Sequence, residues 1–333
     1  MLTDKSKYCF CWFFPLLLLA IMVGGGCQPA YPKISLKPPE DVETVTAPTP
    51  HYLPQTPTSF GPEVPFIRLA IAPVVSLPQT RENYRKLLAY LPEKLEQPLE
   101  LVLRPTYAEI NQLIKQGLVD VALIGSRSYV ELEKDVEIEI LVVPQNEEQD
   151  RYHSFIIVQA ESSIYHVEDL QNKKFVFTDP LSYPGKLYVL HHLAQMGENP
   201  DTFFSDYIYS YSNDNSIIAV AEGWVEAAAV DSLVYNSLIE KNPELEKKTR
   251  VIEVSPAVGN PPLIISANVS DELRNRMEEI FLSMHRNPQG QEVLAEMGIE
   301  RFVLGKDDDY DFIRDILDES AAVTGEAVYQ NQR

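Results

Sequence analysis

The stretch Ala221–Tyr235 reads Ala-Glu-Gly-Trp-Val-Glu-Ala-Ala-Ala-Val-Asp-Ser-Leu-Val-Tyr. These residues predict the end of a helix, a glycine stop at Gly223, a short apolar strand and a second helix that begins at Asp231-Ser232. At such a strand-to-helix junction, backbone N–H groups point beyond the carboxyl end of the strand. The stretch is therefore a candidate edge of a binding site in an α/β fold.

A second stretch, Lys115–Val130, repeats this pattern 106 positions earlier in the chain. It reads Lys-Gln-Gly-Leu-Val-Asp-Val-Ala-Leu-Ile-Gly-Ser-Arg-Ser-Tyr-Val. The residues that are identical at this single offset are Gly117 and Gly223, Val119 and Val225, Ala122 and Ala228, Ser126 and Ser232, and Tyr129 and Tyr235. Two copies of one junction indicate two similar lobes that face each other.

The first 27 residues have the layout of a secretory signal. Lys5 and Lys7 precede an apolar run that ends at Val23, and three glycines and Cys27 follow. A cysteine directly after small residues resembles a bacterial lipoprotein signal, so we expect cleavage and lipid attachment at Cys27. The alternative is an uncleaved signal anchor, since about 18 or more apolar residues can span a bilayer. Both alternatives place the rest of the chain outside the cytoplasmic membrane, in the periplasm or at the cell surface.

A proline-rich segment separates this signal from the folded part. Ten of the 38 residues from Gln28 to Pro65 are proline, which is typical of a semi-rigid spacer that forms no core. Its alternative role is an interaction tail. The predicted organisation is a lipoprotein-type signal at 1–27, a linker at 28–65, lobe 1 at 66–152 and 255–318, lobe 2 at 153–254, and a flexible tail at 319–333.

Strand and helix patterns alternate through the folded part. Strands are predicted at Ile67–Val75, Leu99–Leu103 and Val119–Ile124, with a helix at about Thr80–Glu96 and another that begins at the capping box Thr106–Glu109. This alternation predicts an α/β fold in which each lobe is a mostly parallel sheet flanked by helices. Two lobes joined by two chain crossings make a hinge, and a ligand would bind in the cleft between them.

Composition excludes several classes of function. The formal net charge of −21 leaves no basic face for nucleic acid. All three cysteines lie in the first 27 residues, so the exported domain has no thiol chemistry, and its scattered histidines predict neither a metal site nor a cofactor. No nucleophile elbow, P-loop or dinucleotide fingerprint occurs, which argues against an enzyme. The acidic run Asp307–Asp311 lacks the Gly and Glu of a calcium loop.

Helix-opening loops supply the candidate binding groups. Four of them contain small hydroxyl, amide or carboxylate residues: Ser126-Arg127-Ser128, Ser182-Tyr183, Ser212-Asn213-Asp214 and Asp231-Ser232. Converging helix N-termini hold an oxyanion without a formal cation.

Each of these loops also has an ordinary alternative, because Ser, Asn and Asp are common N-caps. For Asp214 the alternative is a first-turn acid that complements the helix dipole. An ionised carboxylate only accepts hydrogen bonds, so Asp214 or Asp231 in the cleft favours a protonated oxyanion over sulfate.

A family resemblance rests on the stretch Tyr209-Ser-Tyr-Ser-Asn-Asp-Asn-Ser216 followed by Ala219–Ser232. Together with Arg104–Glu109, Val119–Gly125, Tyr152-His153-Ser154, Asp179–Ser182, Ser255-Pro256 and Asn260-Pro261-Pro262, it resembles the phosphate/phosphite/phosphonate-binding proteins of ABC importers (PhnD-like periplasmic binding proteins). The resemblance covers about Ile67 to Asp311. It implies the type II periplasmic-binding-protein fold, a monomer, and delivery of phosphate, phosphite or a small phosphonate to an ABC permease in the membrane.

The resemblance also implies ligand contacts. By motif position these fall on Tyr107, Tyr152, Ser154, Ser182, Asn213, Asp214 and Asp231, and the helix-opening loops add Ser126 and Tyr183. The tyrosine hydroxyls would donate to anion oxygens or wall the site. The alternative for each tyrosine is a buried core ring with a satisfied hydroxyl.

Two departures from the family pattern concern the ligand. Where the family usually has Ser-Thr-Ser-Gly, this chain has Ser182-Tyr183-Pro184-Gly185, which removes two small hydroxyls and one backbone N–H. Asn213 stands where the family often has His, so this position can donate but holds no charge. These departures support an alternative function, a binding protein with an altered ligand that acts as a sensor or surface interaction protein.

Overall fold

The computed structural model describes residues 66–146 and 150–324. The predictions for the signal, for Cys27, for the proline-rich spacer and for residues 325–333 lie outside these ranges. Within the ranges, no helix is both long enough and apolar enough to cross a bilayer.

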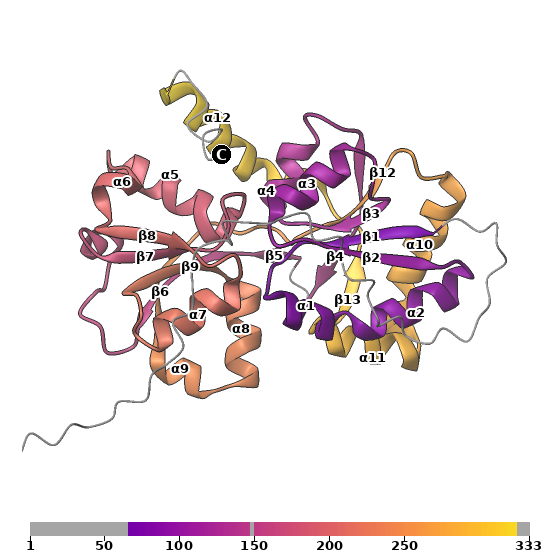
Figure 1. Cartoon of the computed structure of the whole chain (residues 1–333), viewed down its shortest axis with the longest axis horizontal. Helices are drawn as coiled ribbons and strands as arrows, with labels where there is room; N and C mark the ends of the chain where they lie inside the picture. The colour runs from indigo at the N-terminus through magenta and orange to yellow at the C-terminus, as the bar shows by residue number, and fades with distance from the viewer. Residues whose placement is uncertain (1–65, 147–149, 325–333) are drawn as a thin grey trace, which may run out of the picture. The chain divides into compact units, whose positions relative to one another are not determined.

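The first sheet has the strand order β13-β4-β12-β3-β1-β2 (Figure 1). Its strands are β1 (Ile67–Ile71), β2 (Leu99–Leu103), β3 (Val121–Leu123), β4 (Ile138–Gln145), β12 (Leu263–Ser266) and β13 (Arg301–Val303). β1 pairs in parallel with β2 and with β3, while β12 pairs antiparallel with β3 and β4, and β13 antiparallel with β4. This sheet and its helices form the first lobe.

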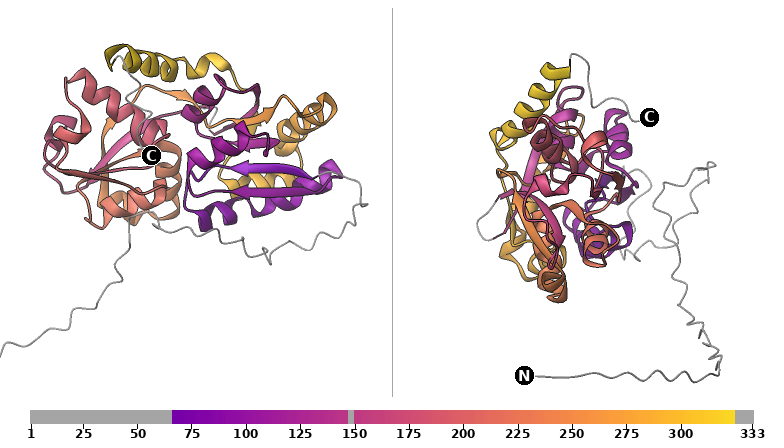
Figure 2. Two further views of the ribbon diagram at one scale, coloured as in Figure 1. Left: turned by 45° about the horizontal axis from the view of Figure 1, so that its top comes forward. Right: turned by 90° about the vertical axis from the view of Figure 1, so that its left-hand side faces the viewer.

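Helices cover both faces of the first sheet (Figures 1 and 2). They are α1 (Leu77–Asn83), α2 (Arg85–Leu95), α3 (Tyr107–Lys115), α4 (Ser126–Leu132), α10 (Asp271–Ser283), α11 (Pro288–Met297) and α12 (Asp311–Thr324), with short 3₁₀ turns η3 (Met284–Arg286) and η4 (Asp307–Tyr310). One core cluster joins the sheet to α2, α10 and α11, and the other joins it to α3, α4 and α12.

The second sheet has the order β10-β6-β9-β7-β8 and, with its helices, forms the second lobe. Its strands are β6 (Ser154–Gln159), β7 (Lys174–Phe177), β8 (Asp206–Tyr209), β9 (Ala227–Asp231) and β10 (Thr249–Val254). Its helical segments are η1 (Val167–Leu170), η2 (Tyr183–Leu187, a π turn), α5 (Tyr188–Gln195), α6 (Pro200–Phe203), α7 (Asn213–Ala221), α8 (Ser232–Lys241) and α9 (Glu244–Lys248). A small antiparallel pair, β5 (Arg151–Tyr152) with β11 (Val258–Gly259), lies where the chain passes between the lobes.

Side-chain alternation explains why β9 is so rich in small apolar residues. Ala227 and Ala229 belong to the core cluster that includes α5 and α6, whereas Ala228 and Val230 belong to the cluster that includes α7 and α8. Successive residues of a strand point to opposite faces, so a strand covered by helices on both sides is apolar throughout. β9 is therefore a central, fully buried strand that ends at Asp231.

The two junction copies have the same local geometry. Gly117 and Gly223 both adopt positive φ, at 67° and 70°. The residue after each glycine donates back to the helix in the same way, Leu118 N to Leu113 O and Trp224 N to Ala219 O, both at 2.9 Å. This is the Schellman ending, which needs a left-handed residue at that position. The repeat found in the sequence is therefore a repeat of structure.

The predicted two-lobed α/β architecture is confirmed, and both of its sheets are mixed. The predicted helix at about Thr80–Glu96 is instead two helices, α1 and α2, which meet at Tyr84. The first helix begins earlier than predicted, at Leu77, because proline is well tolerated in the first turn and Pro78 lies there. The short elements α6, α9 and β13 were not predicted. At the C-terminal end, α12 continues to Thr324, beyond the predicted start of a flexible tail.

Candidate functional site

Helix N-termini from both lobes gather where the strands end. In the first lobe these are the starts of α1, α3 and α4, which follow β1, β2 and β3. In the second lobe they are the starts of η2, α7 and α8, which follow β7, β8 and β9. Hydrogen bonds between the two groups show that they face each other. Such a set of N–H groups and dipoles suits an anionic ligand.

The first set of bonds between the lobes, here called the α7 contact, joins the loop after β1 to the start of α7. Val74 O accepts from Asn213 N at 3.1 Å and from Asn213 Nδ2 at 2.8 Å. In return, Ser76 N donates to Asp214 Oδ1 at 2.9 Å. Donors and acceptors are thus exchanged in both directions between the lobes.

The second set, here called the Asp179 contact, joins the starts of α3 and α4 to the loop after β7. Tyr107 N, at the start of α3, donates to Asp179 Oδ2 at 3.2 Å. Arg127 on α4 is only 1% exposed, and its Nη1 donates to Pro180 O at 2.9 Å. Burial raises the pKa of the Asp179 carboxyl, although backbone N–H groups and the charge of Arg127 lower it. The Asp179 side chain of the second lobe therefore accepts a hydrogen bond from the N-terminus of α3 in the first lobe.

Lys186 adds a second cation beside this contact. The pKa of Lys186 is lowered to about 8, mainly by burial and also by the positive charge of Arg127. The negative charge of Asp179 opposes this change. Its Nζ lies 5.1 Å from the ring centroid of Tyr209. The loop after β7 is therefore surrounded by both signs of charge, despite the acidity of the whole chain.

Asp231 is a second buried acid of the site. It is the N-cap of α8, and its Oδ1 accepts from Leu233 N at 2.7 Å and from Val234 N at 3.3 Å. Burial raises the pKa of the Asp231 carboxyl to about 7, although these two N–H groups lower it. Both capping bonds end on Oδ1, which leaves Oδ2 as an acceptor.

Two predicted tyrosines lie within electrostatic reach of Asp231. Burial raises the pKa of Tyr107 and of Tyr152 well above 10, and the charge of Asp231 raises both further. The Tyr107 ring also packs on Gly125, where an added Cβ would lie 2.9 Å from Tyr107 Cε2. The first junction copy thus needs glycine where the second has Asp231, because the space holds an aromatic ring.

The remaining predicted residues have partners within the protein. Ser126 Oγ donates to Gly259 O at 2.7 Å and also hydrogen-bonds Tyr152. Ser154 Oγ donates to Pro184 O at 2.6 Å, and Ser182 Oγ accepts from Gly185 N at 2.9 Å.

Tyr183 is also committed to the protein. Its side chain is 1% exposed, and its hydroxyl contacts Ser255 Oγ and Pro256 O, each at 3.1 Å. The ring lies 6.1 Å from that of Tyr152, centroid to centroid. The side chain that replaces a small hydroxyl in the family loop therefore fills protein core.

Three buried hydroxyls near these loops have no hydrogen-bond partner among the described residues: those of Ser128, Thr178 and Ser212. Ser212 is the N-cap of α7, yet its hydroxyl does not cap the helix. Thr178 Oγ1 lies where a Cβ of Gly185 would be, which keeps that position a glycine. Sequence reasoning had included Ser128 and Ser212 in helix-opening loops but had not singled out Thr178, the Val74–Ser76 loop or Asp179.

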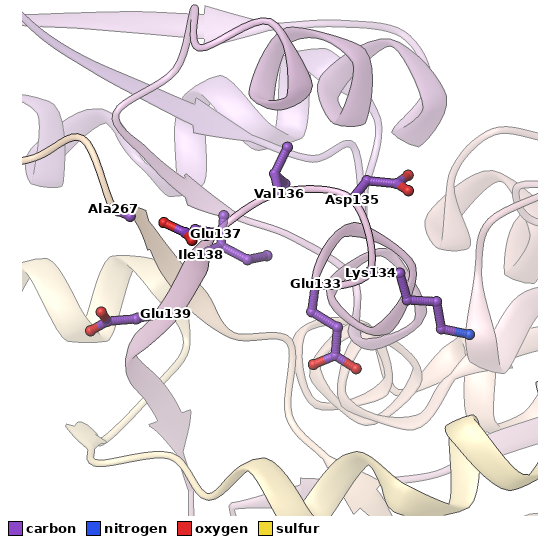
Figure 3. Close-up of a pocket in the computed structure, with 8 residues that line it drawn as sticks. All are labelled: Glu133, Lys134, Asp135, Val136, Glu137, Ile138, Glu139 and Ala267. Atoms are coloured by element: carbon purple, nitrogen blue, oxygen red, sulfur yellow. The ribbon is translucent and has the colours of Figure 1, made fainter.

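A surface pocket of about 470 Å³ lies elsewhere, at the turn between α4 and β4 (Figure 3). Its lining is Glu133, Lys134, Asp135, Val136, Glu137, Ile138, Glu139 and Ala267. The register of β12 places Ile138 beyond Val121, at the amino end of β3. The pocket is therefore at the opposite edge of the first sheet from the helix N-termini, and it contains none of the predicted site residues. In the described residues, no group of three or more acids, histidines or cysteines is arranged to hold a metal ion.

Comparison with known proteins agrees with this geometry. Residues 69–310 match the family model described as "ABC transporter, phosphonate, periplasmic substrate-binding protein". The phosphonates-binding periplasmic protein of Escherichia coli is 23% identical over 232 residues, which are 68% of each chain. The phosphate-import protein PhnD of Mycolicibacterium smegmatis is 25% identical over 240 residues, 68% of this chain and 74% of that protein.

Among solved structures, the binding protein component of an ABC phosphonate transporter from Pseudomonas aeruginosa superposes with a TM-score of 0.71. It is 24% identical in sequence, and the match covers 80% of this chain and 90% of that one. This likeness confirms the type II fold. Because the family model spans most of the chain, this protein belongs to the family of periplasmic substrate-binding proteins of phosphonate ABC transporters.

Proposed function

We propose that this protein captures a small phosphorus oxyanion between its lobes and delivers it to an ABC permease. The ligand class is phosphate, phosphite or a small phosphonate, held by helix N-termini and hydroxyl donors while the lobes close. Membership of the family supports delivery to a transporter. No chemical step is proposed for the ligand.

The observation that supports this ligand best is the buried carboxyl of Asp231 beside Tyr107 and Tyr152. Tyrosine hydroxyls and backbone N–H groups donate to the charged oxygens of an oxyanion. Ionised Asp231 can only accept, so one oxygen of the ligand must bring a proton. Hydrogen phosphate and a monoprotonated phosphonate have such a proton, and sulfate does not.

In this proposal the other predicted ligand residues, Ser126, Ser154, Ser182, Tyr183 and Asn213, shape the site while bonded to the protein. Backbone N–H groups at the starts of α4 and α7 then supply most of the attraction, since those of α8 already donate to Asp231 Oδ1 and His153 O. A site made of dipoles suits a chain whose net charge of −21 repels free anions at long range.

A second candidate function is a binding protein that senses a different ligand instead of serving transport. The loop Ser182–Gly185 favours it, because Pro184 has no N–H, Tyr183 is buried in the core and Ser182 Oγ already accepts from Gly185 N. This loop therefore offers fewer donors than a Ser-Thr-Ser-Gly loop would.

We further propose that the protein is a monomer tethered to the membrane by a lipid on Cys27, in the periplasm or at the cell surface. Labelling of the expressed chain with a fatty-acid analogue tests this. The expected result is a labelled chain that loses its label in the Cys27→Ser variant. Equal labelling of the variant would contradict lipidation at this residue.

A thermal-shift panel with phosphate, phosphite, methylphosphonate and sulfate separates the two functions. We expect the phosphorus ligands to raise the melting temperature and sulfate to leave it unchanged, since a ligand that binds only the native state stabilises it. A melting temperature that none of the phosphorus ligands changes would remove the transport assignment and favour the altered-ligand alternative.

A further inference from the structure

We propose that Asn213 and Asp214 are closure residues: they hold the two lobes together through the α7 contact and set how tightly any ligand is retained, without selecting which one binds. The inference rests on the proposed function in so far as it concerns retention of a ligand. It changes the role of these two residues, because the family resemblance assigns both of them to the ligand itself.

The hydrogen bonds of Asn213 leave its side chain little to offer a ligand. Its Nδ2 donates to Val74 O at 2.8 Å, and its Oδ1 accepts from Asp231 N at 2.9 Å. The residue is 1% exposed. The amide nitrogen thus bonds the other lobe, while the amide oxygen bonds the end of β9.

Asp214 acts in the opposite direction. Its Oδ1 accepts from Ser76 N at 2.9 Å. Asp214 also lies in the first turn of α7, where a negative charge is stabilised by the helix dipole. The same ionised form therefore suits its own helix and the N–H group of the facing lobe.

The Asp179 contact has a similar arrangement. Asp179 accepts from Tyr107 N at the start of α3, and Arg127 donates to Pro180 O. These bonds join the lobes to each other directly. A ligand that binds only the closed state has an apparent affinity proportional to the fraction of protein that is closed. Bonds that stabilise the closed state thus strengthen binding of every ligand by the same factor.

The variant Asn213→Asp tests the proposal with little change of shape. The new carboxylate still accepts from Asp231 N, but it faces the Val74 carbonyl with an acceptor in place of a donor. Asp214→Ala removes the other half of the contact. The matched control is Asp271→Ala, which removes an exposed first-turn acid of α10 that forms an ion pair with Arg274 on the same helix.

Amide hydrogen exchange of the ligand-free full chain measures the contact itself. In Asn213→Asp we expect protection of Ser76 N–H to fall about tenfold, because this donor is covered only while the lobes are closed. Protection of Ile264 in β12 should stay unchanged in the variant, as should that of Ser76 in Asp271→Ala. Unchanged protection of Ser76 in Asn213→Asp would overturn the proposal, whether or not any phosphorus ligand binds.

Calorimetry then separates retention from selection. We expect Asn213→Asp to weaken binding of phosphate and of methylphosphonate about tenfold each, and Asp214→Ala to weaken both about threefold. The ratio of the two affinities should stay at its wild-type value in both variants. A ratio that changes more than the affinities themselves would show that these side chains choose the ligand, and would refute a closure role.

Discussion

Asn213 Oδ1 accepts the backbone N–H of Asp231 at 2.9 Å, so the residue that reaches across to Val74 also positions the acid at the end of β9. The Asn213 side chain therefore bonds both the facing lobe and the end of β9, and the Asn213→Asp variant changes only the first of these two bonds. Asn213 lies at the start of α7 and Asp231 at the end of β9, and both are nearly inaccessible to solvent.

The first prediction concerns selection between phosphate and sulfate. Because the pKa of Asp231 is about 7, the carboxyl is mostly ionised at pH 8 and mostly protonated at pH 6. Ionised Asp231 rejects an oxyanion without a proton, so the preference for phosphate over sulfate should be larger at pH 8 than at pH 6. In Asp231→Asn the preference should be smaller at pH 8, and the change that remains between the two pH values should be the one caused by the titration of phosphate itself. Calorimetric titrations at the two pH values provide the measurement.

Asn keeps the N-capping oxygen of α8, which makes Asp231→Asn its own structural control. A preference for phosphate that changes with pH to the same extent in the wild-type protein and in Asp231→Asn would show that Asp231 does not face the ligand.

The second prediction concerns stability. The folded-state pKa of Asp231, about 7, is above the unfolded value, so the protonated form favours folding. That stability is fully present below the unfolded pKa and is lost as the pH rises through about 7. Asp231→Asn should therefore stabilise the ligand-free protein at pH 8 by up to a few kcal/mol, since one pKa unit is about 1.4 kcal/mol.

The gain should be smaller at pH 5 than at pH 8, and it should vanish only below the unfolded pKa of about 4, where the carboxyl is protonated in both states. Denaturant unfolding of both proteins at pH 5 and pH 8 gives the comparison. Equal stability differences at the two pH values would mean that the charge on Asp231 is not what destabilises the fold.

A third prediction follows from the contact between Gly185 and Thr178. A Cβ at position 185 would lie 1.2 Å from Thr178 Oγ1, so Gly185→Ala must displace the loop after β7. We expect a loss of about 1–3 kcal/mol in the free energy of unfolding, the range for overpacking a core. The double variant Gly185→Ala/Thr178→Ala should recover only part of it, because the hydroxyl is gone but the Cβ of residue 178, at 2.5 Å, and Ser182 Oγ, at 2.9 Å, stay too close. Strictly additive effects in this cycle would exclude the clash as the cause.

The fourth prediction tests Gly125, the counterpart of Asp231 in the first junction copy. Gly125→Ala places a Cβ 2.9 Å from Tyr107 Cε2 and should push the ring out of position. We expect phosphate affinity to fall about tenfold with a smaller loss of stability, because a side-chain ring can shift where a backbone cannot. The matched variant Gly197→Ala meets no atom within 4 Å and should leave affinity unchanged. Its positive φ of 76° predicts only a cost in stability.

Much of the fold could be predicted because its signals are local. The repeat of Gly117–Tyr129 at Gly223–Tyr235 gave the two lobes, and the Thr106–Glu109 capping box, in which Glu109 N donates to Thr106 Oγ1, gave the start of α3. Strands such as β9 were visible as short apolar runs. The break at Tyr84 was missed because the apolar positions that predict the helix, Leu87, Leu88, Leu91 and Leu95, all lie after it.

The site was harder to predict, because its bonds join residues far apart in the chain. Nothing local to Asp214 indicates that it accepts from Ser76, which is 138 positions away. Nothing local to Asp179 indicates that it accepts from Tyr107, 72 positions away. Sequence patterns located the helix N-termini, whereas the partners of each side chain depended on how the lobes meet.

The most direct test of the central claim is a calorimetric titration of the wild-type protein with phosphate and then with sulfate at pH 8. The account predicts saturable heat with phosphate, none with sulfate, and loss of this discrimination in Asp231→Asn. Binding of sulfate as tightly as phosphate, or no heat with phosphate and with methylphosphonate, would contradict it.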